Sequence, residues 1–243
     1  MDRKTYMKDV YWQYWISARD KKYGFLEYDR NLCDYISSNI PQGATLLEVA
    51  VGTGYPFAAF FSAAGYAVHG VDISPQLIQE CQKLFPSISC KVGDVENLDY
   101  PNGYFDATYC FHSTWYFPDL KRAIDEMLRV TRQDGLVIFD IQNRNNHSIE
   151  KNYQKCISET KGIYRVQRYF KNIARIVLRR RPVDWHFVVH EVPVRPEEVY
   201  KHLAARQIKT FKVFARMGNG SLDLQDELGS FVWYPRLVIV VWK

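Results

Sequence analysis

Two hydrophobic periods alternate along the middle of the chain, and their alternation predicts its architecture. Short apolar runs of strand length are separated by segments in which apolar residues recur every three or four positions, as on the buried face of a helix. The strand-like runs are TLLEVAV, AVHGVDIS, ISCKVGD, FDATYCFH and GLVIFDIQN, and helix-like segments between them begin at Pro56, Pro75 and Leu120. Strands that alternate with helices in this way indicate a parallel sheet with helical crossovers.

The pattern changes towards both ends of the chain. Residues 1–40 have helical periodicity, and we expect them to form an N-terminal helical cap. Residues 146–194 interrupt the alternation with a basic, aromatic-rich segment that we interpret as a lid insertion. A helix that begins at Pro196 follows, and then two apolar strands, KTFKVFAR and RLVIVVWK. The loop between these strands is too short for a crossover helix, so antiparallel pairing is favoured.

These elements predict a single α/β domain over residues 1–243. We expect a doubly wound, mostly parallel, seven-stranded Rossmann-like sheet with an antiparallel C-terminal strand and a lid insertion. Composition fits this prediction, because 243 residues suit one domain and 47% hydrophobic residues can fill its core.

Charge and cysteine content narrow the class of protein. The net charge of +5 permits an acidic partner without indicating nucleic acid. The five cysteines form no C-x-x-C pair, which is typical of reduced thiols and predicts no metal site. The charged N-terminus does not have the pattern of a signal peptide, and no apolar run approaches the roughly 18 residues of a membrane span. We therefore expect a cytoplasmic protein.

A glycine-containing turn follows the first predicted strand in EVAVGTG, where Glu48 precedes Gly52 and Gly54. The third glycine of the dinucleotide pattern G-x-G-x-x-G would fall at Phe57, and an acidic residue at the strand end would repel a diphosphate. The turn therefore favours a ligand without a phosphate.

Two further acids follow the next two strands. Asp72 ends the second strand and Asp94 the third, and the carboxyl ends of parallel strands share one crevice. Asp72 lies about 20 residues beyond the turn, where an acid can accept hydrogen bonds from both hydroxyls of a ribose. Together with Glu48, these carboxylates suit a ligand with a cationic end, a ribose and an exocyclic amine. S-adenosylmethionine has this outline.

Four motifs in order resemble those of the class I S-adenosylmethionine-dependent methyltransferases. They are EVAVGTG, HGVDIS, DVENLDYPNGYFDATYC and EMLRVTRQDGLVIFD, over roughly residues 45–145. Two positions depart from the family pattern, because Ala50 and Asp134 replace glycines. The resemblance implies that Asp72 binds the ribose and Asp94 the adenine amine. The implied cofactor contacts are completed by Ala50, Gly52, Gly54, Ile73, Val95 and Phe111.

The segment CFHSTWYFPD after the fourth strand is expected to face the methyl acceptor. His112 is the candidate general base, because its unperturbed pKa lies near neutrality, although a role in the pocket wall is an equal alternative. Tyr11 and Trp15 are candidates to close over the cofactor, or else pack the first helix onto the sheet. The insertion is expected to cover the acceptor, and its basic amphipathic pattern suits either a solvated face or an acidic or lipid-linked acceptor.

The sequence thus predicts a methyltransferase that acts on an oxygen or nitrogen of a small molecule, such as a sugar or secondary metabolite. Enzymes of this fold that methylate amines of DNA bases or glutamine usually carry D/N-P-P-Y/F where this chain has Cys110 to Ser113, so a nucleic-acid partner is not expected. Three alternatives stay open: a protein or nucleic-acid methyltransferase, a dinucleotide oxidoreductase, and a non-catalytic module that binds S-adenosylmethionine.

Overall fold

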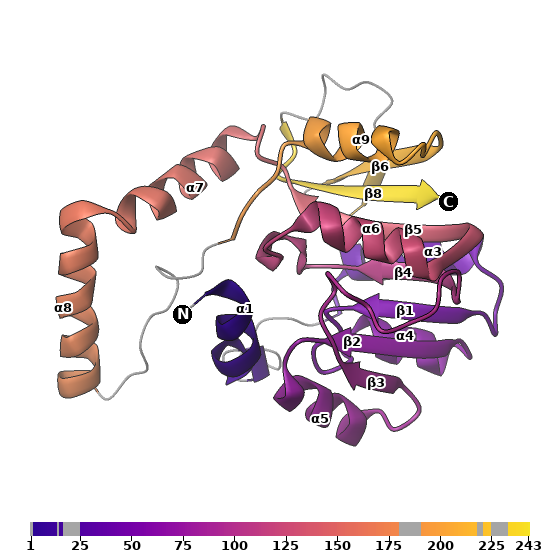
Figure 1. Cartoon of the computed structure of the whole chain (residues 1–243), viewed down its shortest axis with the longest axis horizontal. Helices are drawn as coiled ribbons and strands as arrows, with labels where there is room; N and C mark the ends of the chain where they lie inside the picture. Colours follow the sequence, from indigo (N-terminus) through magenta and orange to yellow (C-terminus); the bar gives the residue numbers. More distant parts are fainter. Residues whose placement is uncertain (1, 14, 17–24, 180–190, 218–220, 225–232) are drawn as a thin grey trace.

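The computed structural model describes all residues except 1, 14, 17–24, 180–190, 218–220 and 225–232. Its centre is an eight-stranded sheet in the order β3-β2-β1-β4-β5-β8-β6-β7. The parallel part consists of β1 (Thr45–Val49), β2 (Ala67–Asp72), β3 (Ser89–Val92), β4 (Phe105–Cys110) and β5 (Thr131–Gln142). The expected doubly wound α/β fold is confirmed (Figure 1).

The remaining strands extend the sheet in antiparallel fashion. β8 (Arg236–Trp242) lies between β5 and β6 (Phe211–Arg216) and pairs antiparallel with both. The short β7 (Leu222–Leu224) pairs with β6 and makes the sheet one strand larger than the seven that the sequence indicates. A three-residue strand is too short to show a hydrophobic period, which explains why the pattern did not predict it.

Helices cover both faces of the sheet, because the central strands are buried along nearly their whole length. In β1, Leu46 packs into one hydrophobic cluster, whereas Leu47 and Val49 pack into the other. The first cluster is covered by α3 (Glu27–Asn39), α4 (Phe57–Ala63) and α5 (Pro75–Leu84), and the second by α6 (Leu120–Val130) and α9 (Pro196–Ala205). Successive side chains of a strand point to opposite faces, so each strand contributes to both cores.

Local signals in the sequence set the helix starts near the pocket. Ser74 caps α5, where its Oγ accepts a hydrogen bond from the Leu77 N–H at 3.5 Å, and Pro75 occupies the first helical position. Asp119 caps α6 in the same way through the Arg122 N–H at 3.1 Å. Both caps satisfy donors that the helix itself cannot pair. They fix the helices that start beyond the carboxyl ends of β2 and β4.

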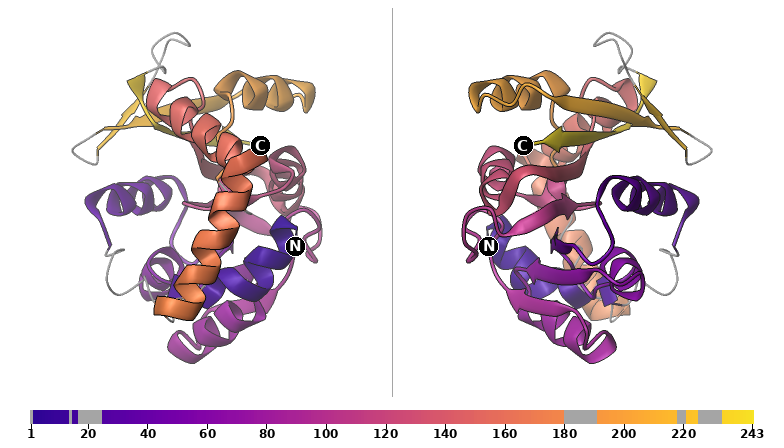
Figure 2. Two further views of the ribbon diagram at one scale, coloured as in Figure 1. Left: turned by 90° about the vertical axis from the view of Figure 1, so that its left-hand side faces the viewer. Right: turned by 90° about the vertical axis from the view of Figure 1, so that its right-hand side faces the viewer.

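The ends of the parallel strands face the N-terminal segment and the insertion. The N-terminal segment contains α1 (Arg3–Tyr6) and the π-helical turn η1 (Met7–Tyr11), and the insertion contains α7 (His147–Glu159) and α8 (Gly162–Arg179). In Figures 1 and 2, α1 lies close to the strand ends, whereas α7 and α8 extend away from the sheet, with α1 between α8 and the strands.

Candidate cofactor and acceptor site

A pocket opens at the carboxyl ends of β1, β2 and β4, below the N-terminal segment. Its empty volume, measured out to the open mouth, is about 1030 Å³, which is enough for a nucleoside-sized ligand. Eleven of the twelve predicted site residues line it: Tyr11, Trp15, Glu48, Ala50, Gly52, Asp72, Ile73, Asp94, Val95, Phe111 and His112. Gly54 does not line it, and its role is one of packing.

The turn after β1 adopts the backbone that its glycines permit. Gly52 has φ +56° and Gly54 has φ +86°, both in the left-handed region. A Cβ on Gly52 would lie 3.1 Å from the Trp15 indole nitrogen, and one on Gly54 would lie 2.9 Å from the Cys81 sulfur. Gly52 therefore allows Trp15 to approach the turn from the pocket side, and Gly54 allows α5 to pack beneath it. Ala50 has φ +58° without a glycine's freedom.

Glu48 lies at the N-terminal end of α4, where a phosphate would otherwise bind. Its side chain is buried and accepts hydrogen bonds from the Tyr109 hydroxyl at 3.3 Å and from the Ala58 backbone N–H in the first turn of α4. Burial raises the pKa of this carboxyl well above its usual range. A ligand ammonium beside Glu48 would favour its ionised form, whereas a phosphate would disfavour that form further.

Asp72 has acceptor capacity left on both carboxylate oxygens. Oδ2 accepts a hydrogen bond from the Gly52 N–H at 3.0 Å, and Oδ1 accepts one from the Ser74 N–H at 2.9 Å. Burial raises the pKa of Asp72 to about 6. Each carboxylate oxygen has a second lone pair, so two oxygens fixed by the backbone can still receive two vicinal hydroxyls.

Asp94 lies in the turn after β3, which ends at Val92, rather than at the strand end that the sequence suggested. Its Oδ2 pairs with Lys4 Nζ at 2.6 Å, and its Oδ1 accepts the Glu96 N–H at 3.0 Å. Lys4 also pairs with Glu96 at 2.6 Å. Among the described residues that line the pocket, Lys4 is the one lysine or arginine, and two carboxylates already neutralise it. The carboxylates and the paired lysine of the pocket therefore fit S-adenosylmethionine better than a diphosphate.

The N-terminal segment covers this pocket, as Tyr11 and Trp15 led us to expect, and it adds Lys4 and Met7, which the sequence pattern did not reveal. Lys4 and Met7 line the pocket with Tyr11 and Trp15, and the Tyr11 and Tyr116 rings lie 5.3 Å apart between their centroids. No described residue of α7 or α8 lines it. Among the described residues of the insertion, its returning end reaches the pocket wall, where Glu191 accepts a hydrogen bond from the Tyr116 hydroxyl at 3.0 Å.

His112 lines the pocket and is held there by charged residues from three elements. Its backbone, with φ +59°, donates its N–H to Asp140 of β5 at 2.8 Å. Its Nε2 lies 2.9 Å from Asp29 Oδ1 of α3, and its Nδ1 lies 2.9 Å from the Arg236 guanidinium of β8. Because arginine only donates and a carboxylate only accepts, Nε2 carries the hydrogen and Nδ1 accepts. An acceptor's proton can reach Nδ1 only by displacing Arg236.

Sequence reasoning missed the three charged partners of His112. Asp140 is fully buried inside the apolar run GLVIFDIQN, and its Oδ2 has no hydrogen-bond partner among the described residues. An acid inside a buried strand is a signal that could have been noticed, because such a group needs a compensating contact. Asp29 and Arg236 carried no such signal, since Asp29 lies in the first turn of α3 and Arg236 is the first residue of β8, where polar residues are ordinary.

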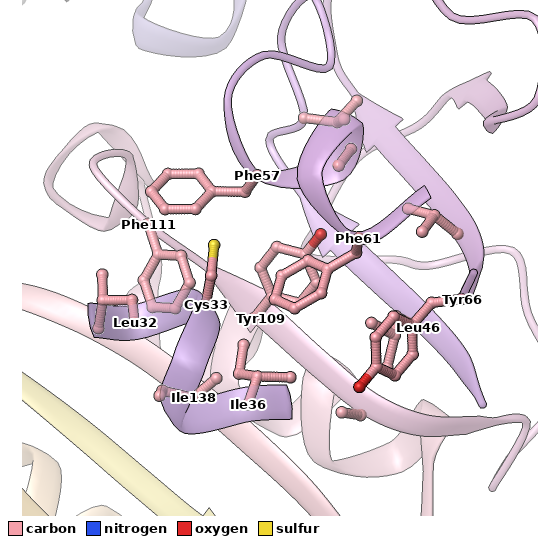
Figure 3. Packing of buried hydrophobic residues seen from close by; sticks show 14 of the residues in the cluster. Leu32, Cys33, Ile36, Leu46, Phe57, Phe61, Tyr66, Tyr109, Phe111 and Ile138 are labelled. Carbon is pink, nitrogen blue, oxygen red and sulfur yellow. The ribbon is translucent and has the colours of Figure 1, made fainter. Parts of the chain in front are cut away.

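The pocket wall between the Gly52 turn and His112 is aromatic. Figure 3 shows Phe57 of α4 and Phe111, just after β4, next to each other above the buried core, and their ring centroids lie 4.9 Å apart. The His112 ring stacks on Phe57 at 5.8 Å. Tyr116, Phe117 and Pro118 continue the wall. Within the described residues, no group of three or more His, Cys, Asp or Glu side chains could hold a metal ion.

The fold and the acidic strand ends define a Rossmann-like domain with a site for a nucleoside without phosphates. Residues 47–139 match the methyltransferase domain family. The chain is 30% identical over 118 residues to the 2-methyl-6-phytyl-1,4-hydroquinone methyltransferase of Synechocystis sp., covering 47% of this chain and 37% of that protein. It is 31% identical over 98 residues to the malonyl-[acyl-carrier protein] O-methyltransferase of Erwinia billingiae, covering 40% and 39%.

A solved structure extends the likeness to the whole fold. An S-adenosylmethionine-dependent methyltransferase of Thermotoga maritima superimposes with a TM-score of 0.59 at 18% identity, over 96% of this chain and 98% of that one. Residues 47–139 match a methyltransferase domain, the chain shares its fold with an S-adenosylmethionine-dependent methyltransferase, and S-adenosylmethionine is the cofactor that this domain type uses. The chain spans about two fifths of the length of the two curated relatives, 37% and 39%.

Proposed function

We propose that this chain transfers a methyl group from S-adenosylmethionine to an oxygen or nitrogen of a small, apolar, ring-containing secondary metabolite. The observation that carries this proposal is the aromatic wall of Phe57, Phe111 and Tyr116, next to His112 and continuous with the carboxylate-lined turn. A sugar acceptor would need several hydrogen-bonding groups on this wall, whereas a flat apolar ring packs on it directly.

In this proposal one group of residues binds the cofactor and another aligns the acceptor. Glu48 and Asp72 hold the amino end and ribose of the cofactor, which supplies a methyl group on a sulfonium that is already activated. The N-terminal segment and the aromatic wall exclude water and align the acceptor, and alignment can supply much of the rate of such a displacement. His112 Nδ1 takes the proton of a hydroxyl or ammonium acceptor once Arg236 has moved aside.

The two curated relatives support a small acceptor but not one particular acceptor. One is named for a hydroquinone and the other for a malonyl group on a carrier protein. The ring of the first suits the aromatic wall. A protein or nucleic-acid acceptor and a non-catalytic binding role are the competing functions, and the experiment below separates them.

The test has two steps with purified protein. Calorimetry should show binding of S-adenosylhomocysteine and none of NAD. Transfer of labelled methyl from S-adenosylmethionine should then be screened against panels of phenols and quinols, amines, sugars, peptides and oligonucleotides. Methylation confined to ring-containing small molecules supports the proposal. Cofactor binding without transfer to any panel favours a binding module, and transfer mainly to sugars, peptides or oligonucleotides refutes the proposed acceptor class.

A further inference from the structure

The largest exposed apolar surface among the described residues lies on α8, outside the pocket. Seven of the thirteen exposed large hydrophobic side chains belong to this one helix, and the other six are scattered over the rest of the described chain. Val166 is 53% exposed, Phe170 64% and Val177 69%. Single exposed apolar residues are ordinary, but a contiguous group of this size marks an interaction surface.

Five of these seven side chains form one stripe along the helix. Ile163, Val166, Phe170, Ile173 and Val177 follow one another at intervals of three and four residues, which is the spacing of one helical face. At 1.5 Å per residue, the 18 residues of α8 extend over about 27 Å. The helix therefore presents a long, narrow apolar surface rather than a compact apolar patch.

The charge of α8 has a single sign. Between Gly162 and Arg179 the sequence has four arginines and one lysine, with no aspartate or glutamate. The helical period places Lys171 away from the apolar stripe. The neighbouring α7 has two lysines and two glutamates, so an excess of cations is specific to α8.

We propose that α8 docks this protein on the surface of an anionic lipid bilayer. A helix that combines an apolar stripe with charged residues that are all cationic has the pattern of a helix that lies in the headgroup region, where the stripe enters the acyl boundary and the cations meet anionic headgroups. A second copy of the chain fits less well, since α8 has no acidic residue with which the cations of another α8 could pair. This docking does not depend on the proposed methyl transfer.

The position of α8 adds a reason for such docking. Figures 1 and 2 place α7 and α8 beyond the carboxyl ends of the parallel strands, on the same side as the N-terminal segment that covers the pocket. A bilayer along α8 would therefore face the pocket side of the protein. An apolar acceptor dissolved in the lipid would then lie near the pocket mouth.

The experiment is sedimentation of the full chain with vesicles of phosphatidylcholine, with and without about 30% phosphatidylglycerol. The intact protein should bind the anionic vesicles at least about tenfold more strongly than the neutral ones, and salt should weaken binding. The triple variant Val166→Ser, Phe170→Ser, Val177→Ser keeps every charge and should lose about tenfold or more of this binding. Lys171→Glu with Arg175→Glu keeps the stripe and should remove the preference for anionic lipid.

A matched control substitutes exposed apolar residues elsewhere. Leu84→Ser with Val92→Ser and Tyr104→Ser, which are 40%, 50% and 49% exposed, should leave vesicle binding unchanged. Equal binding to both vesicle types, or an equal loss in this control, refutes the proposal. The proposal is also refuted if the intact protein binds no vesicles and light scattering shows a dimer that the triple serine variant no longer forms. The stripe would then be an interface between copies of the chain. Binding of S-adenosylhomocysteine by every variant checks that each one is folded.

Discussion

Asp72 links the pH dependence of folding to cofactor binding, and the substitution Asp72→Asn separates the two effects. Asparagine keeps the size of the side chain but has no charge at any pH. In the native protein the carboxyl group is buried with a pKa of about 6, whereas an unfolded aspartate titrates near 3.8. The folded state therefore holds the proton more tightly than the unfolded state does. Stability from this group is fully present below pH 3.8 and is lost as pH rises through about 6.

The size of the effect follows from this difference in pKa. A difference of about two units corresponds to about 3 kcal/mol, and about 2 kcal/mol of it falls between pH 4.5 and 7.5. Asparagine also points an N–H₂ group at the backbone N–H of Gly52 or Ser74, which costs about 1–3 kcal/mol at every pH. This second cost cancels when the two pH values are compared.

Urea unfolding of both proteins at several pH values measures the effect. The free energy of unfolding of the wild type should fall by about 2 kcal/mol relative to Asp72→Asn as pH rises from 4.5 to 7.5. Asp99→Asn is the matched control, because the Asp99 side chain is fully exposed at 101% and the variant should follow the wild type. Curves of wild type and Asp72→Asn that run parallel over this range would refute the assignment of a raised pKa to Asp72. The variant should also bind S-adenosylhomocysteine about 1.5–3 kcal/mol more weakly at pH 7.5, the range for hydrogen bonds to a charged group.

Three further substitutions test other parts of the site. Ala50→Gly should raise the free energy of unfolding by up to about 1 kcal/mol in urea titrations, because the φ of +58° strains an alanine but not a glycine. Lys4→Met should speed dissociation of S-adenosylhomocysteine up to about fivefold in stopped-flow measurements, since it removes partly exposed ion pairs with Asp94 and Glu96. His112→Ala should lower kcat of methyl transfer about 10²–10⁴-fold and leave the affinity for S-adenosylhomocysteine nearly unchanged.

Each of these expectations has an outcome that contradicts it. A less stable Ala50→Gly protein would mean that the methyl group of Ala50 packs usefully in the turn. An unchanged dissociation rate in Lys4→Met would mean that the N-terminal segment does not hold the ligand in. A fall in kcat of less than about fivefold in His112→Ala would mean that alignment alone carries the reaction or that another group takes the proton.

The sequence predicted the parts of the site that lie within single strand–turn–helix units. Glu48 is the penultimate residue of β1 and Asp72 the last of β2, and the backbone donors that fix Asp72 lie in the adjacent turns, so a local pattern was sufficient. The doubly wound fold followed from the same alternation. The first residues of the chain were expected to cap the domain, and Tyr11 and Trp15 do line the pocket in the structure.

The unpredicted contacts join residues that are far apart along the chain. Asp29 and Arg236 meet His112 across 83 and 124 positions, and Lys4 meets Asp94 across 90. No hydrophobic period encodes such a pairing, because each of these side chains is an ordinary polar residue on its own element. The lid role of residues 146–194 stays a prediction, since their described helices extend away from the pocket in Figure 1.

The place of β8 in the sheet has a consequence for how the protein is made. β8 is the last strand in chain order, yet it lies between β5 and β6, and its pairing with β5 joins positions as far apart as Leu136 and Trp242. A ribosome delivers β8 after every other strand, so β5 has an unpaired edge until then. The same strand brings Arg236 to His112. The contacts around His112 can therefore form only after β8 has joined β5, and until then the edge of β5 can pair with other strands.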